Sequence, residues 1–214
     1  MTEASIIPPQ WKLAGSAYVL LYQFSHEYVA EHSFVPPDLA GLFVGGIGAA
    51  LLGDYDASPV GPYRELLFIP GRFAYGRKGV TSITKAYVST AAAVAAGRAN
   101  WGIPRELADF SLTHENGIDR FQVAAGGHPF LEADFRPGRL PFPVATRLFP
   151  LRFQQPADGR LYVTEPRASG WARLADLARP RVDPAYFPDI AHARPLGTLS
   201  LRRFTLTLPL PRIE

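Results

Sequence analysis

Proline and glycine punctuate this chain from end to end and limit the length of any helix that it forms. The 214 residues include 21 prolines and 19 glycines. Proline interrupts helices and central strands, and glycine marks turns and bulges, so this composition favours short strands joined by loops. With 47% hydrophobic and 19% charged residues, the chain has enough apolar surface to bury a core. The length suits one domain, and we predict a single domain over residues 1–214.

Strand-like segments dominate the pattern of apolar residues. β-Branched and aromatic runs, or alternating apolar and polar residues, predict strands. They cover residues 17–24, 39–52 (interrupted by glycines), 63–69, 80–90, 118–124, 130–135, 160–164 and 204–211. Helices are predicted at 25–32, 91–100 and 171–178, and a turn at 54–62. With the further apolar–polar alternation after residue 111, the prediction is about ten strands and three short helices. This predicts an α+β chain, predominantly antiparallel β, in which a curled sheet or barrel carries short helices at its rim.

Several classes of site and location are excluded by what the chain lacks. It contains no cysteine, which excludes disulfides, thiolate metal sites and a cysteine nucleophile. The N-terminal segment has no basic stretch followed by an apolar core, so no secretory signal is predicted. The longest uncharged run, residues 39–53, holds 15 residues of which five are glycine, which is too short for a membrane span. We therefore expect a cytoplasmic protein with no membrane partner.

The charge is unevenly distributed along the chain. Residues 1–135 hold nine basic and thirteen acidic side chains, a balance of −4, whereas residues 136–214 hold thirteen and six, a balance of +7. A basic segment raises the possibility of a nucleic-acid site. The arginines are spaced singly, however, and nucleic-acid sites cluster their charge or interleave it with aromatic residues. We predict no nucleic-acid partner.

The common cofactor and metal motifs are incomplete. Residues 46–51, GIGAAL, place a leucine where the third glycine of a dinucleotide-binding loop belongs. His26-Glu27 begins like a zinc-binding HExxH motif, but Ala30 replaces the second histidine. We predict no cofactor and no metal.

The segment between residues 61 and 110 carries the strongest functional signal. It contains Tyr63-Arg64-Glu65, then Tyr87-Val88, then GRANWGIPREL over residues 97–107. This resembles the acetoacetate decarboxylase superfamily, in which a Y-x-E strand precedes a Y-[LV]-D-N…A-x-G-R-E-x-x-G-x-P-K-K-L block. The resemblance implies a cone-shaped antiparallel β-barrel with an apolar cavity and peripheral helices. Relatives form multimers, so it also implies a homo-oligomer.

The family's chemistry depends on a lysine that this chain does not have at the matching position. In the family, the first lysine of the P-K-K segment forms an imine with a β-keto acid, and the imine accepts the electrons released with CO₂. Here the pair is Arg105-Glu106, and a guanidinium stays protonated and cannot attack a carbonyl. The family's site arginine falls near residues 15–16 and its first glutamate near residues 49–50, where neither is present. Only Glu65 matches a site group, so the resemblance implies the fold but not decarboxylation.

The residues in this segment each have a functional and a structural interpretation. Glu65 is either a cavity carboxylate acting as acid or base, or an inert ion-pair partner of Arg105. Arg105 either binds a ligand carboxylate or neutralises Glu65 in a closed site. Lys85 lies two residues before Tyr87 on one predicted strand, so both side chains share a face. If that face lines the barrel, Lys85 is a relocated imine-forming residue; if not, it is a surface lysine.

Three further residues complete the predicted site. Tyr63 and Trp101, with Tyr87, either line a ligand pocket or belong to the core, and Glu106 is a candidate ligand contact. The leading hypothesis is a protein of the acetoacetate decarboxylase type that binds a small carbonyl, carboxylate or apolar ligand and forms no imine at position 105. One alternative is a lyase or aldolase-like enzyme using Lys85 and Glu65. Another is a non-catalytic scaffold whose cavity is filled by side chains.

Overall fold

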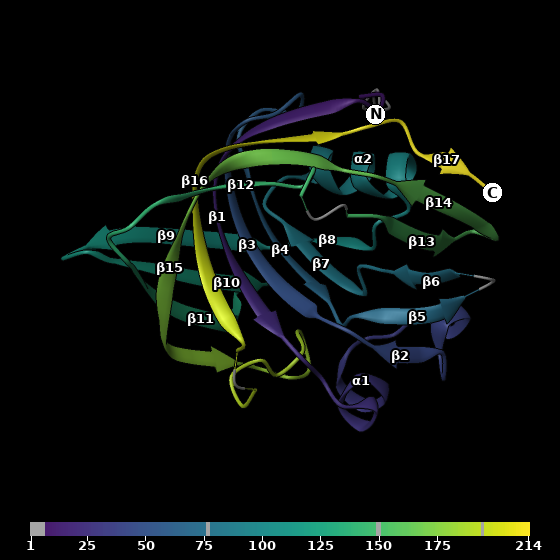
Figure 1. Ribbon diagram of the computed structural model, residues 1–214, viewed down its shortest axis with the longest axis horizontal. Helices are drawn as coiled ribbons and strands as arrows, with labels where there is room; N and C mark the ends of the chain where they lie inside the picture. Colours follow the sequence, from purple (N-terminus) through teal and green to yellow (C-terminus); the bar gives the residue numbers. More distant parts are fainter. Residues whose placement is uncertain (1–6, 76–77, 149–150, 194) are drawn as a thin grey trace.

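Two β-sheets account for most of the chain, and short helices lie at their edges (Figure 1). The computed structural model describes residues 7–75, 78–148, 151–193 and 195–214. Within these ranges it contains seventeen strands, two α-helices and one 3₁₀ helix. The predicted predominance of antiparallel β-structure is confirmed.

The larger sheet runs across the whole molecule. Its order is β8 (Arg105–Leu107), β7 (Lys85–Val88), β4 (Tyr63–Ile69), β3 (Gly48–Ala57), β1 (Trp11–Tyr22), β16 (Gly197–Leu208), β15 (Arg167–Val182), β11 (His128–Pro137), β10 (Ile118–Ala125) and β9 (Asp109–Glu115). β12 (Phe142–Ala145) also pairs with β15. All these pairs are antiparallel except β7 with β8. Only Ala108 separates β8 from β9, so the first and last strands of this order are neighbours in the chain.

The smaller sheet lies to one side of the long strands β1, β3 and β4, opposite β9 to β11 (Figure 1). Its order is β17 (Arg212–Ile213), β14 (Arg160–Thr164), β13 (Phe153–Ala157), β6 (Lys78–Thr81), β5 (Arg72–Tyr75) and β2 (Phe43–Gly45). The chain therefore crosses between the two sheets several times.

Two of the three predicted helices are confirmed. Helix α1 (His26–His32) begins at Ser25, whose Oγ accepts a hydrogen bond from the Tyr28 amide at 3.1 Å. Helix α2 (Ala91–Trp101) begins after Thr90 and ends at Gly102, which has the left-handed φ of 64° typical of a helix C-terminus. A 3₁₀ turn, η1 (Pro37–Leu39), precedes β2. None of the helices in the described ranges is long and apolar enough to span a membrane.

The prediction of a third helix, at residues 171–178, is wrong. These residues belong to β15, where Trp171 pairs with Arg202 and Leu174 with Leu199 of β16. Helix propensity is a weak preference, and here strands on both sides supply the backbone partners.

Four other boundaries differ, because the chain passes between sheets or because strand pairing extends farther or ends earlier than the pattern predicts. Residues 39–52 are divided by Gly45 and Gly46, with φ of 91° and 99°, into β2 of the smaller sheet and β3 of the larger one. Residues 80–90 are likewise divided between β6 and β7. The predicted turn at 54–62 is shorter, because Tyr55 still pairs with Tyr63 in the sheet. The predicted 204–211 strand ends at Leu208, which leaves Leu210 exposed.

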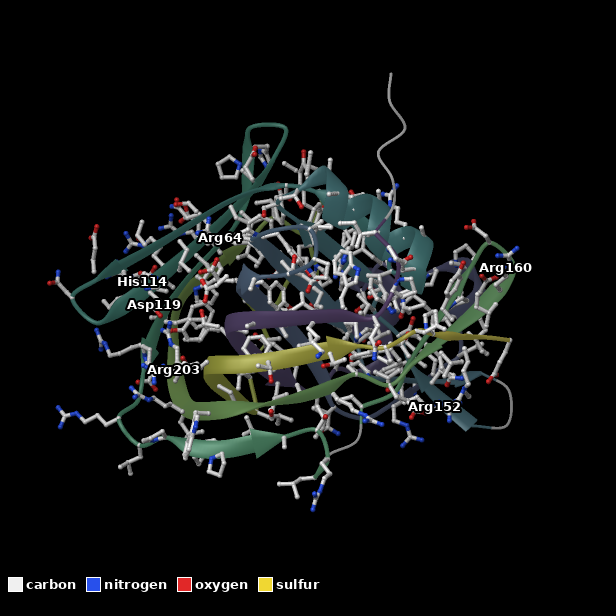
Figure 2. All side chains as sticks on the ribbon, turned by 90° about the horizontal axis from the view of Figure 1, so that it is seen from above. Arg64, His114, Asp119, Arg152, Arg160 and Arg203 are labelled. Carbon is white, nitrogen blue, oxygen red and sulfur yellow. The ribbon has the colours of Figure 1, made fainter. Side chains whose placement is uncertain are left out.

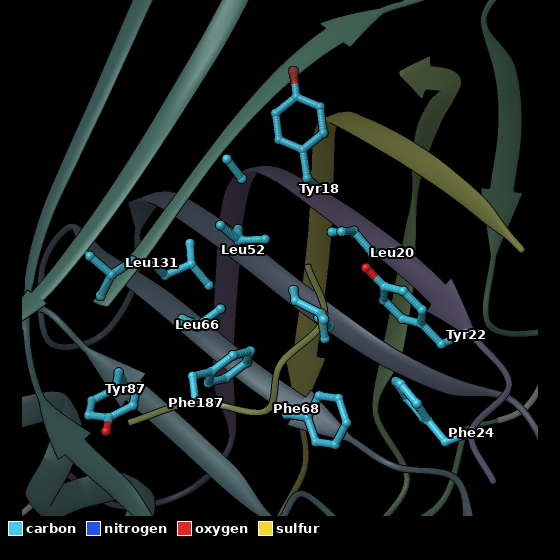
Figure 3. Close-up of a cluster of buried hydrophobic side chains, with 14 of the residues drawn as sticks. Tyr18, Leu20, Tyr22, Phe24, Leu52, Leu66, Phe68, Tyr87, Leu131 and Phe187 are labelled. Atoms are coloured by element: carbon cyan, nitrogen blue, oxygen red, sulfur yellow. The ribbon is translucent and has the colours of Figure 1, made fainter. Parts of the chain in front are cut away.

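Two apolar cores lie on the two faces of the sheet formed by β1, β3, β4 and β7. The first core contains Tyr18, Leu52, Leu66 and Tyr87, which neighbour one another across these strands (Figure 3). The second core, on the opposite face, is covered by α2. It includes Trp11, Leu13, Tyr55, Tyr63, Ala93, Ala96 and Trp101. The face on which a side chain lies therefore decides which residues it can meet.

Candidate functional site

Two of the predicted site residues, Glu65 and Arg105, form a buried ion pair. Glu65 on β4 and Arg105 on β8 have exposed fractions of 3% and 1%. Arg105 donates from Nε and Nη2 to Glu65 Oε1, at 3.0 and 2.6 Å, and from Nη1 to the carbonyl of Ala93 in α2 at 3.2 Å. Burial disfavours the charged guanidinium, but the Glu65 carboxylate outweighs this effect and raises the pKa of Arg105. Arg105 therefore stays charged, and it forms a buried ion pair with the Glu65 carboxylate.

Two tyrosines complete the surroundings of this pair. The Tyr55 hydroxyl donates to Glu65 Oε2 at 3.0 Å. The Tyr63 ring faces the Arg105 guanidinium, whose central carbon lies 5.7 Å from the ring centroid. Burial, and then the negative charge of Glu65, raises the pKa of Tyr55 well above its ordinary value. Tyr55 stays a neutral hydrogen-bond donor, and both oxygens of Glu65 are satisfied within the protein.

Helix α2 approaches Arg105 closely and positions it. A Cβ atom on Gly97 would collide with Cδ of Arg105 and lie 2.8 Å from its Nη1, so the helix requires glycine at this close approach. The next residue, Arg98, donates from Nε to the backbone carbonyl of Arg105 at 2.8 Å. The Gly97-Arg98 pair of the motif thus positions both the side chain and the backbone of residue 105.

Lys85 forms a different ion pair, on the other face of the sheet. Its Nζ lies 2.6 Å from Glu106 Oε1, and it lies 4.8 Å from the ring centroid of Phe34 and 4.9 Å from that of Tyr87. The Lys85 side chain is 13% exposed. Tyr87 is buried in the first core, and its hydroxyl donates to the carbonyl of Tyr186 at 3.0 Å (Figure 3). Lys85 and Tyr87 share a face, as the spacing predicts.

The structure does not bring Lys85 and Glu65 together. In the pairing of β4 with β7, Glu65 is opposite Val88 and Lys85 is opposite Phe68. Paired residues share a face and successive residues alternate, so Glu65 faces the second core and Lys85 the first. A mechanism in which both act on one substrate, as the lyase alternative requires, does not fit this geometry. Glu106 takes the place of Glu65 as the carboxylate beside Lys85.

The remaining predicted residues divide between core and cleft. Trp101 is buried, donates from Nε1 to the carbonyl of Pro209 at 2.9 Å and packs edge-on against Trp11 with ring centroids 5.2 Å apart. Tyr63 lines a cleft of about 320 Å³ together with Asp54, Tyr55, Asp56, Pro62, Arg64 and Ser89. Tyr55 and Tyr63 separate this cleft from the buried pair. Tyr55 was missed because its segment reads as a turn.

A second cleft, of about 420 Å³, lies beside the end of α2. It is lined by residues 82–84, 102–104 and 155–158 with Phe34, Pro36, Arg98 and Glu106. Of these, Glu106 alone was a predicted site residue. Arg98 stands in the motif that carries the family resemblance, so its presence there was a signal available from the sequence. Neither cleft is lined by Glu65 or Arg105. Within the described ranges, no group of three or more histidines and carboxylates is placed to hold a metal.

A third charged cluster lies away from the motif, and sequence reasoning missed it. Asp119 on β10 accepts hydrogen bonds from the Tyr18 hydroxyl at 2.5 Å and from Arg202, and its other oxygen contacts His114 Nδ1 at 2.7 Å (Figure 2). Burial raises the pKa of Asp119, but the hydrogen bonds from Tyr18 and His114 and the charge of Arg202 outweigh it, so the pKa is lowered. This cluster ties β1, β9, β10 and β16 together.

Comparison with known proteins identifies the family. The model of the family described as acetoacetate decarboxylase (ADC) matches residues 1–191. Because this is most of the chain, the protein belongs to the acetoacetate decarboxylase family. No curated protein sequence matches the chain.

Solved structures agree with this fold. The acetoacetate decarboxylase of Legionella pneumophila is 16% identical, with a TM-score of 0.71 over 97% of this chain and 88% of that one. The enduracididine biosynthesis enzyme MppR, complexed with pyruvate, is 16% identical, with a TM-score of 0.62 over 99% and 93%. An acetoacetate decarboxylase-like enzyme from Sphingomonas wittichii is 12% identical, with a TM-score of 0.65 over 99% and 95%. The prediction of an acetoacetate decarboxylase-like fold is confirmed.

Proposed function

We propose that this protein binds a small carbonyl or carboxylate compound and does not use position 105 for imine chemistry. The observation that carries the proposal is the pairing of Arg105 with Glu65, at the position where the family's motif has its lysine. A guanidinium has no free lone pair with which to attack a carbonyl carbon.

The arrangement of the pair also argues against Arg105 as a ligand anchor. A ligand carboxylate would have to replace Glu65, which already accepts two hydrogen bonds from Arg105 and one from Tyr55. Breaking a buried ion pair leaves an uncompensated charge and costs about 3–5 kcal/mol. A small ligand seldom compensates such a loss, so binding at a cleft outside this pair is favoured. The pyruvate complex of MppR supports a small oxo acid as the first compound to test.

The proposal separates into binding and chemistry, and both are measurable. The melting temperature is recorded with increasing concentrations of acetoacetate, pyruvate, 2-oxobutyrate and small aldehydes, because a ligand that binds only the folded state raises it. The same mixtures are treated with borohydride, which makes an imine permanent, and the intact mass is determined. We expect a concentration-dependent rise in melting temperature with at least one compound and no added mass. No rise with any compound would favour the filled, non-catalytic scaffold instead.

The contact of Lys85 with Glu106 supports a second candidate function. A carboxylate 2.6 Å from the amine is placed to accept a proton from Lys85 and to return it during imine formation. The chain has only three lysines, Lys12, Lys78 and Lys85, so an adduct is readily mapped. An adduct on Lys85 that is absent in Lys85→Arg and retained in Lys12→Arg would favour this lyase-type reaction over simple binding.

A further inference from the structure

The cleft beside the end of α2 has the size and lining of a small-ligand site. Its volume of about 420 Å³ falls within the range of ordinary ligand pockets. Three segments far apart in the sequence form it: the link between β6 and β7, the link between α2 and β8, and the hairpin of β13 and β14. We name it the Arg98 cleft.

On the floor of the Arg98 cleft, the polar groups of Ser82, Ile83 and Gln155 are bonded to one another, whereas the Thr84 hydroxyl is buried without a partner in the protein. Ser82 Oγ and the Ile83 amide donate to Gln155 Oε1 at 2.7 and 2.6 Å, and Gln155 Nε2 donates to the Ile83 carbonyl at 2.9 Å. Ile103 and Pro104 add apolar surface along the wall. A ligand therefore meets a preformed surface that offers mainly apolar contact at this level.

Arg98 is the fixed cation of this cleft. Its Nε is held by the Arg105 carbonyl at 2.8 Å, which restrains the plane of the guanidinium, while the side chain as a whole is exposed. Within the described part of the chain, no carboxylate forms an ion pair with Arg98. The paired Nη groups of an arginine suit the two oxygens of a carboxylate.

The two acidic residues of the cleft are not equivalent. Glu106 is neutralised by Lys85, whose Nζ lies 2.6 Å from its Oε1. Asp158, in the turn between β13 and β14, has no ion-pair partner among the residues that the structure describes. Asp158 therefore opposes the binding of an anion, whereas Arg98 favours it.

We propose that the Arg98 cleft binds a small organic carboxylate, with the carboxylate on Arg98 and the apolar body against Ile103 and Pro104. This inference rests on the proposed function and gives that ligand a place and an anchor. The site is separate from the Glu65–Arg105 pair, which belongs to the second core.

The test compares ligands that differ only in charge. Butyrate, 2-oxobutyrate and the neutral butyramide are titrated against the full chain, and dissociation constants are taken from the melting temperatures or from calorimetry. We expect both carboxylates to bind and butyramide to bind at least about tenfold more weakly, because a charge-assisted bidentate contact is lost.

Two variants should change carboxylate affinity in opposite directions. Arg98→Gln is expected to weaken it about tenfold or more. Asp158→Asn is expected to strengthen it about twofold, since it removes a nearby like charge at the solvent boundary. Asn tolerates the φ of 52° at this position as well as Asp does, so the turn is kept. Arg160→Gln is the matched control: Arg160 lies on β14 of the hairpin that carries Asp158 (Figure 2) and does not line the cleft, so removing its positive charge should leave the affinity unchanged.

The outcomes distinguish this inference from the proposed function. If the natural chain binds an oxo acid but Arg98→Gln and Asp158→Asn both bind it with unchanged affinity, the Arg98 cleft is wrong and the proposed function stands. Equal binding of butyramide and butyrate also overturns the cleft assignment. If no carboxylate or carbonyl compound binds the natural chain, the proposed function itself fails. Should Arg98→Gln not fold, because the bond to the Arg105 carbonyl is lost, Asp158→Asn and the butyramide comparison decide.

Discussion

Removing one partner of the Glu65–Arg105 pair should destabilise the protein far more than removing both. Glu65→Leu leaves the buried Arg105 charge without its carboxylate, and Arg105→Met leaves Glu65 without its guanidinium. Each single change should cost about 3–5 kcal/mol, because the remaining charge is desolvated and unpaired. With both changes present, together with Tyr55→Phe to remove the donor that Glu65 satisfied, the cost should fall below about 2 kcal/mol.

The assay is reversible urea unfolding followed by tryptophan fluorescence, since Trp101 lies in the same core as the pair. A neighbouring ion pair, which joins β4 to β3 instead of β8, is the control. Arg64 Nε lies 2.9 Å from Asp54 Oδ1, but these side chains are 36% and 25% exposed, so Asp54→Asn should cost less than about 1 kcal/mol. If a single variant does not fold, Glu65→Gln replaces Glu65→Leu. Additive costs in the combined variant would refute the view that the pair is one compensated unit.

Three smaller predictions concern local packing and charge. Gly97→Ala should destabilise by about 1–3 kcal/mol, despite better helix propensity, because Arg105 cannot move aside; unchanged stability would show that it can. Thr84→Val should raise the free energy of unfolding by about 1 kcal/mol, and with it the urea midpoint, because the Thr84 hydroxyl is buried without a partner in the protein; a lower midpoint would contradict this. Asp119→Asn should cost about 1–3 kcal/mol at pH 7. Because the pKa of Asp119 is lowered in the folded state, its contribution is present above about pH 4 and lost as the pH falls further, so the two proteins should converge in acid.

Much of the secondary structure follows from local pattern. The run at 63–69 became β4 with the same limits, and Ser25 caps α1, because strand alternation and helix capping depend on residues close in sequence. The prediction at 171–178 was wrong because the structure of this segment depends on residues distant in sequence. Its residues suit a helix, but β16 and β11 lie on either side and turn it into a strand.

The sequence predicted the residues of the candidate site, but it did not predict which of their side chains contact one another. The motif and its surroundings indicated Glu65, Lys85, Arg105 and Glu106 as site residues, and all four lie on the adjacent strands β4, β7 and β8. Which side chains meet depends on register: Lys85 lies opposite Phe68 on β4, so it faces away from Glu65 and toward Glu106. A shift of one residue in that pairing would exchange the faces.

The sequence by itself determined the family, the predominance of β-structure and the presence of Arg105-Glu106, with no lysine, after Pro104. These properties follow from residue identity and short-range spacing. Only the tertiary structure decided that Arg105 forms an ion pair with Glu65, that Lys85 lies on the opposite face of the sheet from Glu65, and that Arg98 lines a cleft. Those outcomes arise from contacts between residues separated by up to dozens of positions, and the free energy of such contacts depends on burial and register that no local pattern specifies.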